Sequence, residues 1–193
     1  MIKIDFHFPP LVKKLKRGGP AVTQPKDAGL VFGYTGIGKD SKVLELGSGS
    51  GFMTVQMANI VRSVKTYDKR EEFSKLAQEN VEKAGMTNVE FVLQDVLEKL
   101  DEPDNEYDLV FCDIAEPEKI IEKLYKTVKK DGFLVGHCLQ SEQTKTLQLA
   151  AQKCFTEVFV LEGVTREYEA KQFGFRPKHF GLTYTAYLVF ARK

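Results

Sequence analysis

The sequence is poor in the residues that build metal centres and disulfide frameworks. Among its 193 residues are three cysteines and three histidines. The cysteines, Cys112, Cys138 and Cys154, are odd in number and lie in apolar segments, so we expect buried thiols in a reducing compartment. The histidines are scattered along the chain. We therefore expect no disulfide and no metal site.

No apolar stretch of the sequence is long enough to cross a membrane, and none has the features of a signal peptide. We therefore expect a cytoplasmic protein without a membrane partner. A chain of 193 residues can form one domain with a sizeable core. Its contents of 42% hydrophobic and 28% charged residues are ordinary for a globular protein.

The net charge of +1 conceals an uneven distribution. Residues 1–40 hold seven Lys or Arg against three acids, and residues 160–193 hold six against three. Residues 41–159 hold fifteen against twenty-one. Basic ends around an acidic centre are compatible with a polyanionic substrate, and equally with an ordinary solvated surface.

One glycine-rich segment organises the chain. The apolar run at residues 43–46 is typical of a buried strand, and residues 47–51 then read G-S-G-S-G before a helical segment. The pattern lacks the third glycine of the dinucleotide fingerprint, where Phe52 stands, and the G-K-[ST] of a P-loop. Strand, loop and helix predict the first βα unit of a nucleotide-binding sheet. The alternative is a glycine turn that binds nothing.

A second apolar segment ends in a carboxylate, in the order V-K-T-Y-D at residues 64–68. An acid at the end of the second strand can accept hydrogen bonds from both hydroxyls of a ribose. We expect Asp68 to have this role. The alternative is an N-cap for the helix predicted over residues 71–84.

Short apolar runs alternate with helical patterns over most of the chain, which predicts a doubly wound α/β sheet. The predicted strands are residues 43–46, 64–67, 89–93, 109–112, 133–136, 156–162 and 184–191. The predicted helices are residues 27–34, 53–60, 71–84, 117–128 and 141–154, with a short turn near 96–100. No helix separates the last two strands.

The segment E-L-G-S-G-S-G at residues 45–51 resembles motif I of the S-adenosylmethionine (SAM) methyltransferases of the Rossmann-like class. The resemblance implies SAM as the cofactor. It also implies a seven-stranded, mostly parallel sheet whose last strand is antiparallel. Residues 1–40 are then an N-terminal arm on the substrate side, and residues 41–193 are the methyltransferase domain, within one structural domain overall.

Ligands of open α/β sheets lie at the carboxyl ends of the strands, near the switch point. Asp95 follows the third strand, where it can accept a hydrogen bond from the adenine amino group of SAM or cap the next turn. Asp113 follows the fourth strand, which we expect beside the first. It should face the methyl group and the substrate as the catalytic residue, while Glu116 is more simply an acidic helix-start residue.

Three further segments resemble the TrmI-type tRNA (adenine-N1)-methyltransferases from about residue 16 to the end. Residues 17–28, R-G-G-P-A-V-T-Q-P-K-D-A, are similar to the segment that precedes motif I in that family. Residues 113–117, D-I-A-E-P, resemble its D-[LI]-x-x-P motif IV. The closing R-P-K-H and T-Y-T-A-Y-L-V-F-A-R-K segments resemble its C-terminal pattern.

The sequence departs from that family in three places. Those enzymes usually carry an N-terminal β-domain, whereas this sequence begins close to the catalytic domain, so we expect less surface for tRNA. Gln24 stands where a tyrosine is common, which alters the wall beside the target base. Tyr184 stands where a histidine is common.

The resemblance implies a SAM-dependent tRNA methyltransferase that acts on N1 of adenine in the T-loop, as a homo-oligomer and by family habit a tetramer. The expected SAM-binding residues are Gln24, Glu45, Gly47, Ser48, Gly49, Ser50, Gly51, Phe52, Met53, Asp68, Lys69, Phe73, Asp95, Val96 and Asp113. The expected RNA contacts are Lys13, Lys14, Lys16, Arg17, Arg166, Arg176, Lys178 and His179, with a structural ion pair as the alternative for Arg176.

Two other functions remain open from the residues. One is methyl transfer to a small molecule or a protein, as in corrinoid-pathway or isoaspartate enzymes. The other is an RNA-binding subunit that serves a catalytic partner. The intact glycine loop, Asp68 and Asp113 argue against the second.

Overall fold

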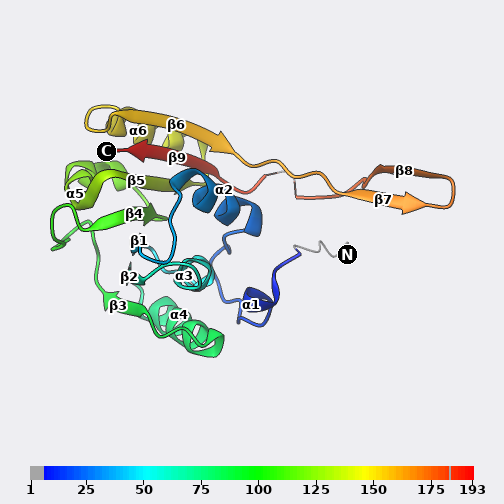
Figure 1. The fold of residues 1–193 in the computed structure, drawn as a ribbon, viewed down its shortest axis with the longest axis horizontal. Helices are drawn as coiled ribbons and strands as arrows, with labels where there is room; N and C mark the ends of the chain where they lie inside the picture. The colour runs from blue at the N-terminus through cyan, green and yellow to red at the C-terminus, as the bar shows by residue number, and fades with distance from the viewer. Residues whose placement is uncertain (1–6, 183) are drawn as a thin grey trace.

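A seven-stranded sheet with helices on both faces forms the body of the protein (Figure 1). The computed structural model describes residues 7–182 and 184–193. The strand order is β3-β2-β1-β4-β5-β9-β6, with β9 antiparallel to β5 and β6 and the other neighbours parallel. The predicted doubly wound α/β sheet with an antiparallel last strand is confirmed.

The strands of this sheet follow the apolar runs of the sequence. They are β1 (Lys42–Leu46), β2 (Ser63–Asp68), β3 (Val89–Leu93), β4 (Tyr107–Cys112), β5 (Val128–Cys138), β6 (Glu157–Glu162) and β9 (Tyr187–Arg192). Successive residues of a strand point to opposite faces, so a strand covered on both faces is apolar along its length. In β1, Val43 packs in one core cluster and Leu44 in the other.

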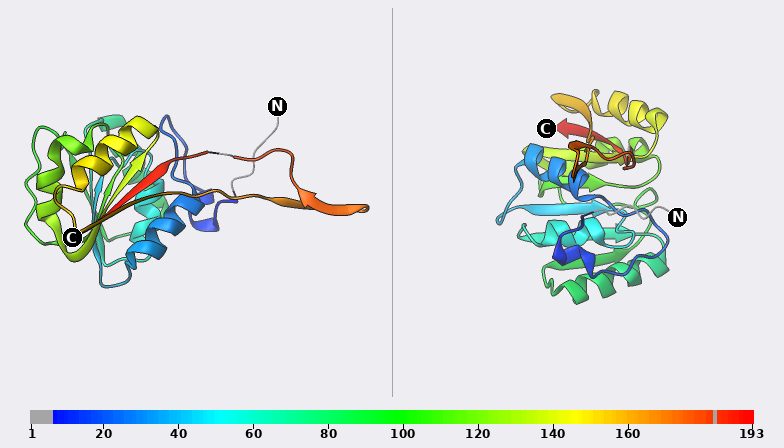
Figure 2. Two further views of the ribbon diagram at one scale, coloured as in Figure 1. Left: turned by 90° about the horizontal axis from the view of Figure 1, so that it is seen from above. Right: turned by 90° about the vertical axis from the view of Figure 1, so that its right-hand side faces the viewer.

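Helices cover the two faces of the sheet in separate groups (Figure 2). The helices are α1 (Pro10–Lys13), α2 (Pro25–Thr35), α3 (Phe52–Ala58), α4 (Glu71–Ala84), η1 (Pro117–Ile120), α5 (Ile121–Thr127) and α6 (Ser141–Ala151). Residues of α2 and α3 pack with Val43, whereas residues of α5 and α6 pack with Leu44. Among the described residues, no helix is both long and apolar enough to span a membrane.

Several predicted boundaries differ from the observed ones. The last strand was predicted to begin at residue 184 but begins at Tyr187. Tyr187, the first residue of β9, pairs with the last residues of its two neighbours, Cys138 of β5 and Glu162 of β6. Residues 184–186 therefore have no strand beside them to pair with. The region predicted as one helix over 117–128 is a 3-10 turn followed by α5, and β5 already begins at Val128.

The structure contains a β-hairpin between β6 and β9 that the sequence does not predict. Strands β7 (Tyr168–Lys171) and β8 (Gly174–Pro177) pair antiparallel and project well away from the sheet (Figures 1 and 2). Their side chains are mostly exposed, and Phe173 in the turn between them is 93% exposed. Because neither face is buried in the body, the sequence carries no strand-like alternation there.

The switch point of the sheet lies between β1 and β4. From β1 the chain builds outward through β2 and β3 on one side, and through β4 and β5 on the other. The loops that follow β1 and β4 therefore diverge, which leaves a crevice at their carboxyl ends. The glycine loop and Asp113 both lie at this crevice.

Candidate active site

The glycine loop turns directly against the end of β4. The Gly47 N–H donates to the Tyr67 carbonyl at 2.7 Å, and the Asp113 N–H donates to the Leu46 carbonyl at 2.8 Å. Gly47 has φ of +94°, and a Cβ there would lie 2.3 Å from the Asp113 carbonyl oxygen. Any larger residue would separate the two strand ends, so glycine is required at this position.

A second close approach joins the loop to α4. Gly51 has φ of +76°, and a Cβ there would lie 3.0 Å from the Cα of Ala77. The fully buried Asn80 donates from Nδ2 to the Ser50 carbonyl and to the Lys16 carbonyl, both at 2.9 Å. Asn80 also accepts from the Lys16 N–H at 2.8 Å. One amide on α4 thus holds the N-terminal segment against the glycine loop.

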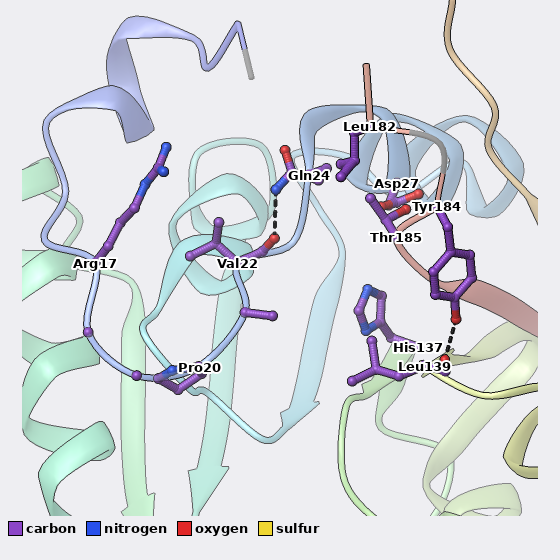
Figure 3. A pocket seen from close by; sticks show the side chains of 13 residues that line it. Arg17, Pro20, Val22, Gln24, Asp27, His137, Leu139, Leu182, Tyr184 and Thr185 are labelled. Carbon is purple, nitrogen blue, oxygen red and sulfur yellow. Dashed lines mark hydrogen bonds between the residues drawn. The ribbon is translucent and has the colours of Figure 1, made fainter. Parts of the chain in front are cut away.

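Three adjoining cavities open at this edge of the sheet. The arm cavity, about 450 Å³, is lined by residues 17–22, Gln24, Asp27, His137, Leu139, Leu182, Tyr184 and Thr185 (Figure 3). The loop cavity, about 260 Å³, is lined by residues 20–23, 47–50, Phe52, Met53, Arg70, Asp113, His137 and Leu139. The strand-end cavity, about 260 Å³, is lined by Gly47, residues 67–70, 94–97 and 113–116.

The cavities share residues at their boundaries. Asp113, Gly47 and Arg70 line both the loop and strand-end cavities, and His137 lines both the loop and arm cavities. A ligand in the loop and strand-end cavities would therefore lie beside Asp113, and a second molecule in the arm cavity would share His137 with it as a neighbour. Most of the predicted SAM-binding residues thus line the loop and strand-end cavities.

Asp68 lies where the sequence predicts it, and three groups already hold its carboxylate. It accepts from the Gly49 N–H at 3.0 Å, from the Arg70 N–H at 3.0 Å, and from two nitrogens of the Arg70 guanidinium at 3.0 and 3.1 Å. Burial acts to raise the pKa of Asp68, but these hydrogen bonds hold it below its ordinary value. Arg70 must share or leave this carboxylate if a ribose is to bind it. The helix-capping alternative does not apply, since α4 begins after Arg70 without a side-chain cap.

Asp95 lies opposite Asp68 in the strand-end cavity. Its Oδ2 is 3.0 Å from the Lys69 ammonium, and its Oδ1 accepts from the Leu97 N–H at 3.0 Å. The hydrogen bond from Lys69, followed by that from Leu97, holds the pKa of Asp95 below its ordinary value. The capping alternative for Asp95 is therefore present, and its two partners leave the carboxylate at the cavity wall with the buried Val96 beside it.

Asp113 lies at the junction of the cavities with His137 as its neighbour. Its side chain is 36% exposed, and Oδ1 is 3.3 Å from His137 Nδ1. The hydrogen bond to Leu46 described above holds the backbone of Asp113 at the switch point. An acid in this position can accept from a donor on a bound substrate and stabilise a positive charge that develops there.

Glu45 is fully buried behind the loop and contributes no surface to the cavities. Its Oε2 accepts from the Thr54 and Thr66 hydroxyls, both at 2.6 Å, and its Oε1 has no hydrogen-bond partner among the described residues. Burial raises the pKa of the Glu45 carboxyl to about 7, against the opposing effect of the two threonines. Glu45 therefore joins β1 to α3 and β2 from beneath the loop.

Two predicted SAM-binding residues, Gln24 and Phe73, line neither the loop cavity nor the strand-end cavity. Gln24 is buried, and its Nε2 donates to the Val22 carbonyl at 3.1 Å within the arm cavity (Figure 3). Phe73 on α4 lies under the Arg70 guanidinium, 4.2 Å from ring centroid to Cζ, and does not line any of the three cavities.

The predicted RNA contacts fall into two groups far apart in the fold. Lys13 and Lys14 are exposed at α1, and Lys16 pairs with Glu79 on α4 at 2.6 Å. Arg17 lines the arm cavity. The other four, Arg166, Arg176, Lys178 and His179, belong to the projecting hairpin and its flanks. There Arg176 pairs with Glu169 and Lys178 with Glu167, so the ion-pair alternative for Arg176 is present.

Three residues of this region are missing from the sequence prediction. Asn80 and His137 act on neighbours that are distant in the sequence, and Arg70 acts on Asp68 two residues away, where no motif assigns it a role. Only His137 carries a signal, because it lies near the carboxyl end of the fifth strand, the edge where ligands bind. Among the described residues, no cluster of His, Cys, Asp and Glu could hold a metal ion.

Known proteins are similar to this chain in sequence and in fold. A family model described as a methyltransferase domain matches residues 37–172. The chain is 30% identical to the tRNA (adenine(57)-N(1)/adenine(58)-N(1))-methyltransferase TrmI of Methanocaldococcus jannaschii, over 94% of this chain and 74% of that protein. It is 31% identical to the tRNA (adenine(58)-N(1))-methyltransferase TrmI of Thermus thermophilus, over 99% of this chain and 77% of that protein. The crystal structure of a tRNA methyltransferase TrmI from Aquifex aeolicus superposes with a TM-score of 0.89, at 28% identity, over 96% of this chain and 76% of that one.

This chain belongs to the TrmI family of methyltransferases. The predicted family is thus confirmed. The similarity to TrmI extends beyond the general methyltransferase domain and includes most of the wall of the arm cavity. Residues 17–22, Gln24, Asp27, Leu182, Tyr184 and Thr185 all lie outside residues 37–172.

The buried Glu45 predicts a pH-dependent stability. Its pKa in the folded protein, about 7, exceeds the ordinary 4.5, so the folded state favours the protonated form. The stability contributed by that form is present below about pH 4.5 and is lost as the pH rises to about 7. Glu45→Gln keeps an oxygen for the two threonines and removes this titration.

We expect Glu45→Gln to gain about 2 kcal/mol in free energy of unfolding relative to wild type when the pH is raised from 5 to 8. Urea denaturation at both pH values measures the difference. Glu122→Gln, at an exposed position of α5, is the matched control. A Glu45→Gln effect that is equal at both pH values would contradict the assignment.

Proposed function

We propose that this chain transfers the methyl group of SAM to N1 of an adenine in the T-loop of tRNA. The observation that carries the proposal is the position of Asp113, which lines both cavities of the donor side and lies 3.3 Å from His137, a residue that also lines the arm cavity. The acceptor side is built from segments that the chain shares with TrmI outside the general methyltransferase domain.

The loop and strand-end cavities suit SAM as a ligand. The Ser48 hydroxyl is buried without a hydrogen-bond partner among the described residues, and it lines the loop cavity. Asp68 and Asp95 offer carboxylates to a ribose and an amino group in the strand-end cavity. SAM supplies a methyl group on a positively charged sulfur. The chain's own part is to bind this donor and to hold its reactive end near Asp113.

The acceptor chemistry needs position more than a base. N1 of neutral adenine carries a lone pair, so it bonds to the methyl carbon as the carbon–sulfur bond breaks, and the sulfur leaves as a neutral thioether. The positive charge then lies on the adenine ring. The Asp113 carboxylate would accept from the exocyclic amino group, which orients the base and stabilises that charge.

An adenine within a folded RNA must leave its stack to reach this site, at a cost of a few kcal/mol. The arm cavity offers apolar and aromatic walls for such a base in Val22, Leu139 and Tyr184. Exposed Lys13 and Lys14 at α1 would contact phosphates beside its opening.

The projecting hairpin supports the proposal of a homo-oligomer, by family habit a tetramer. Phe173 and Phe175 are 93% and 73% exposed at its tip, and Tyr168 stacks on Phe175 with ring centroids 5.2 Å apart. An isolated two-stranded hairpin is only marginally stable in water. A second copy of the chain would cover these rings and add RNA-binding surface.

Incubation with methyl-labelled SAM and unmodified tRNA transcripts tests the function, followed by nucleoside digestion and mass spectrometry. N1-methyladenosine is the expected product. Label incorporated only into a small molecule or a protein would support one of the alternative acceptors instead. No incorporation, with SAM binding retained, would support the alternative of a subunit that needs a catalytic partner.

Asp113→Ala should separate binding from transfer. We expect SAM affinity to change little, because the loop, Asp68 and Asp95 remain, while the methylation rate falls at least about 100-fold. Single-turnover methylation and calorimetric titration with SAM measure the two quantities. Asp104→Ala, in an exposed loop, is the control. A methylation rate in Asp113→Ala close to that of wild type would remove Asp113 from the catalytic role.

The double variant Lys13→Ala/Lys14→Ala should weaken tRNA binding through lost phosphate contacts. We expect a loss of roughly tenfold in affinity and a salt dependence reduced by about two in slope, with SAM binding unchanged. Filter binding over a series of salt concentrations measures both. Lys145→Ala on α6, across the sheet, is the control. An unchanged salt slope would show that these lysines do not contact tRNA.

A further inference from the structure

His137 connects the donor and acceptor sides of the site. It lines both the loop cavity and the arm cavity, and its side chain is 7% exposed. Its Nδ1 lies 3.3 Å from Asp113 Oδ1, which is ion-pair distance, but the two are not aligned as a hydrogen bond. Among the described residues, this buried nitrogen has no hydrogen-bond partner. Such a group is costly unless a ligand or a small movement completes it.

The surroundings hold the imidazole in this position. The backbone of His137 lies in β5 and pairs with Leu188 of β9, and the ring centroid lies 6.1 Å from that of Phe111. The ring projects into the arm cavity (Figure 3). The imidazole therefore stays in the site, and what can change is whether it carries one proton or two.

Charged groups face His137 from two other elements. Asp113 approaches from the end of β4, and Asp27 from α2, where it is fully buried. Asp27 Oδ1 is 2.7 Å from the Lys26 ammonium, and Oδ2 has no partner among the described residues. The other charged or titratable side chains that line the two cavities are Arg17, Arg70 and Tyr184.

The carboxylates favour the charged form of His137 in the free protein. Burial acts to lower the pKa of His137, but Asp113, and after it Asp27, hold it above its ordinary value of 6.5. A positively charged donor in the loop cavity changes this balance. Two like charges within a cavity of about 260 Å³ disfavour each other, so an imidazolium there would lose its proton.

We propose that His137 is a positioning residue that must be neutral for methyl transfer, with its Nδ1–H donated to Asp113 and its proton released when the cationic donor binds. The role of His137 in methyl transfer rests on the proposed function, whereas the release of its proton on binding of the donor does not. The neutral imidazole orients the Asp113 carboxylate toward the base. A neutral imidazole also leaves no positive charge of its own beside the cationic donor and, after transfer, beside the positively charged methylated adenine.

Proton release on ligand binding tests the charge step without any acceptor. Calorimetric titration in buffers of different ionisation enthalpy gives the number of protons released by SAM and by S-adenosylhomocysteine, whose sulfur is neutral. We expect SAM to release more protons than S-adenosylhomocysteine, with the largest difference near the pKa of His137. Comparison with His137→Gln removes the contribution of the ligand's own amino group.

In His137→Gln the difference between the two ligands should vanish while both still bind. His137→Asn serves as a second variant if the first fails to bind S-adenosylhomocysteine. A difference that persists in the variant, or no difference in wild type, would overturn the proposal. If wild type forms no N1-methyladenosine, the proposed function fails, but this measurement still decides the behaviour of His137.

The pH profile of methylation tests the positioning role. In wild type we expect the single-turnover rate, at saturating SAM, to rise with pH through the pKa that His137 has in the SAM complex, which lies below its pKa in the free protein. In His137→Gln this rise should be absent and the rate on the plateau about 10- to 100-fold lower. His7→Gln, at an exposed histidine outside the cavities, should keep the rise. An unchanged rise and plateau in His137→Gln would contradict the role, since a structural histidine would not shape the pH profile.

Discussion

The site depends on two strand ends that meet without a side chain between them. Because Gly47 has no Cβ, the carbonyl of Asp113 can lie beside it, and the loop after β1 and the acid after β4 converge on one point. Gly47 and Asp113 both line the loop cavity and the strand-end cavity beside this contact. Gly51 in the same way allows the loop to lie close against the backbone of α4, and Asn80 of α4 holds the N-terminal segment over the loop. The N-terminal segment that lines the acceptor cavity is thus held in place by the glycine loop and α4 of the donor side.

The charges of the site fit a reaction between a cation and a neutral base. Carboxylates at Asp68, Asp95 and Asp113 line the space for the donor, and Asp27 lines the acceptor side. The exposed basic residues lie outside, at α1 and on the hairpin, where a polyanion would approach. This separation explains why the net charge of the chain is nearly neutral while its ends are basic.

Most of the sheet and the main acids of the site can be predicted from the sequence, because both follow local patterns. Buried parallel strands are continuous apolar runs, and Asp68, Asp95 and Asp113 stand at their carboxyl ends. The hairpin was missed because no part of the body buries it. The roles of Asn80 and His137 depend on residues that are distant in the sequence and meet them only after folding. The role of Arg70 is local, but no sequence pattern predicts that its guanidinium turns back onto Asp68. The interaction of Arg70 with Asp68 changes the picture most, since the predicted ribose acceptor is already occupied by a guanidinium.

The central claim is that the donor and the acceptor occupy adjoining cavities that meet at Asp113 and His137. A crystal structure of the chain with S-adenosylhomocysteine and an adenine-containing RNA tests it most directly. The account predicts the cofactor product in the loop and strand-end cavities and the base in the arm cavity. The exocyclic amino group should lie about 3 Å from the Asp113 carboxylate, with N1 facing the sulfur. An adenine bound outside the arm cavity, or one whose amino group faces away from Asp113, would contradict the account.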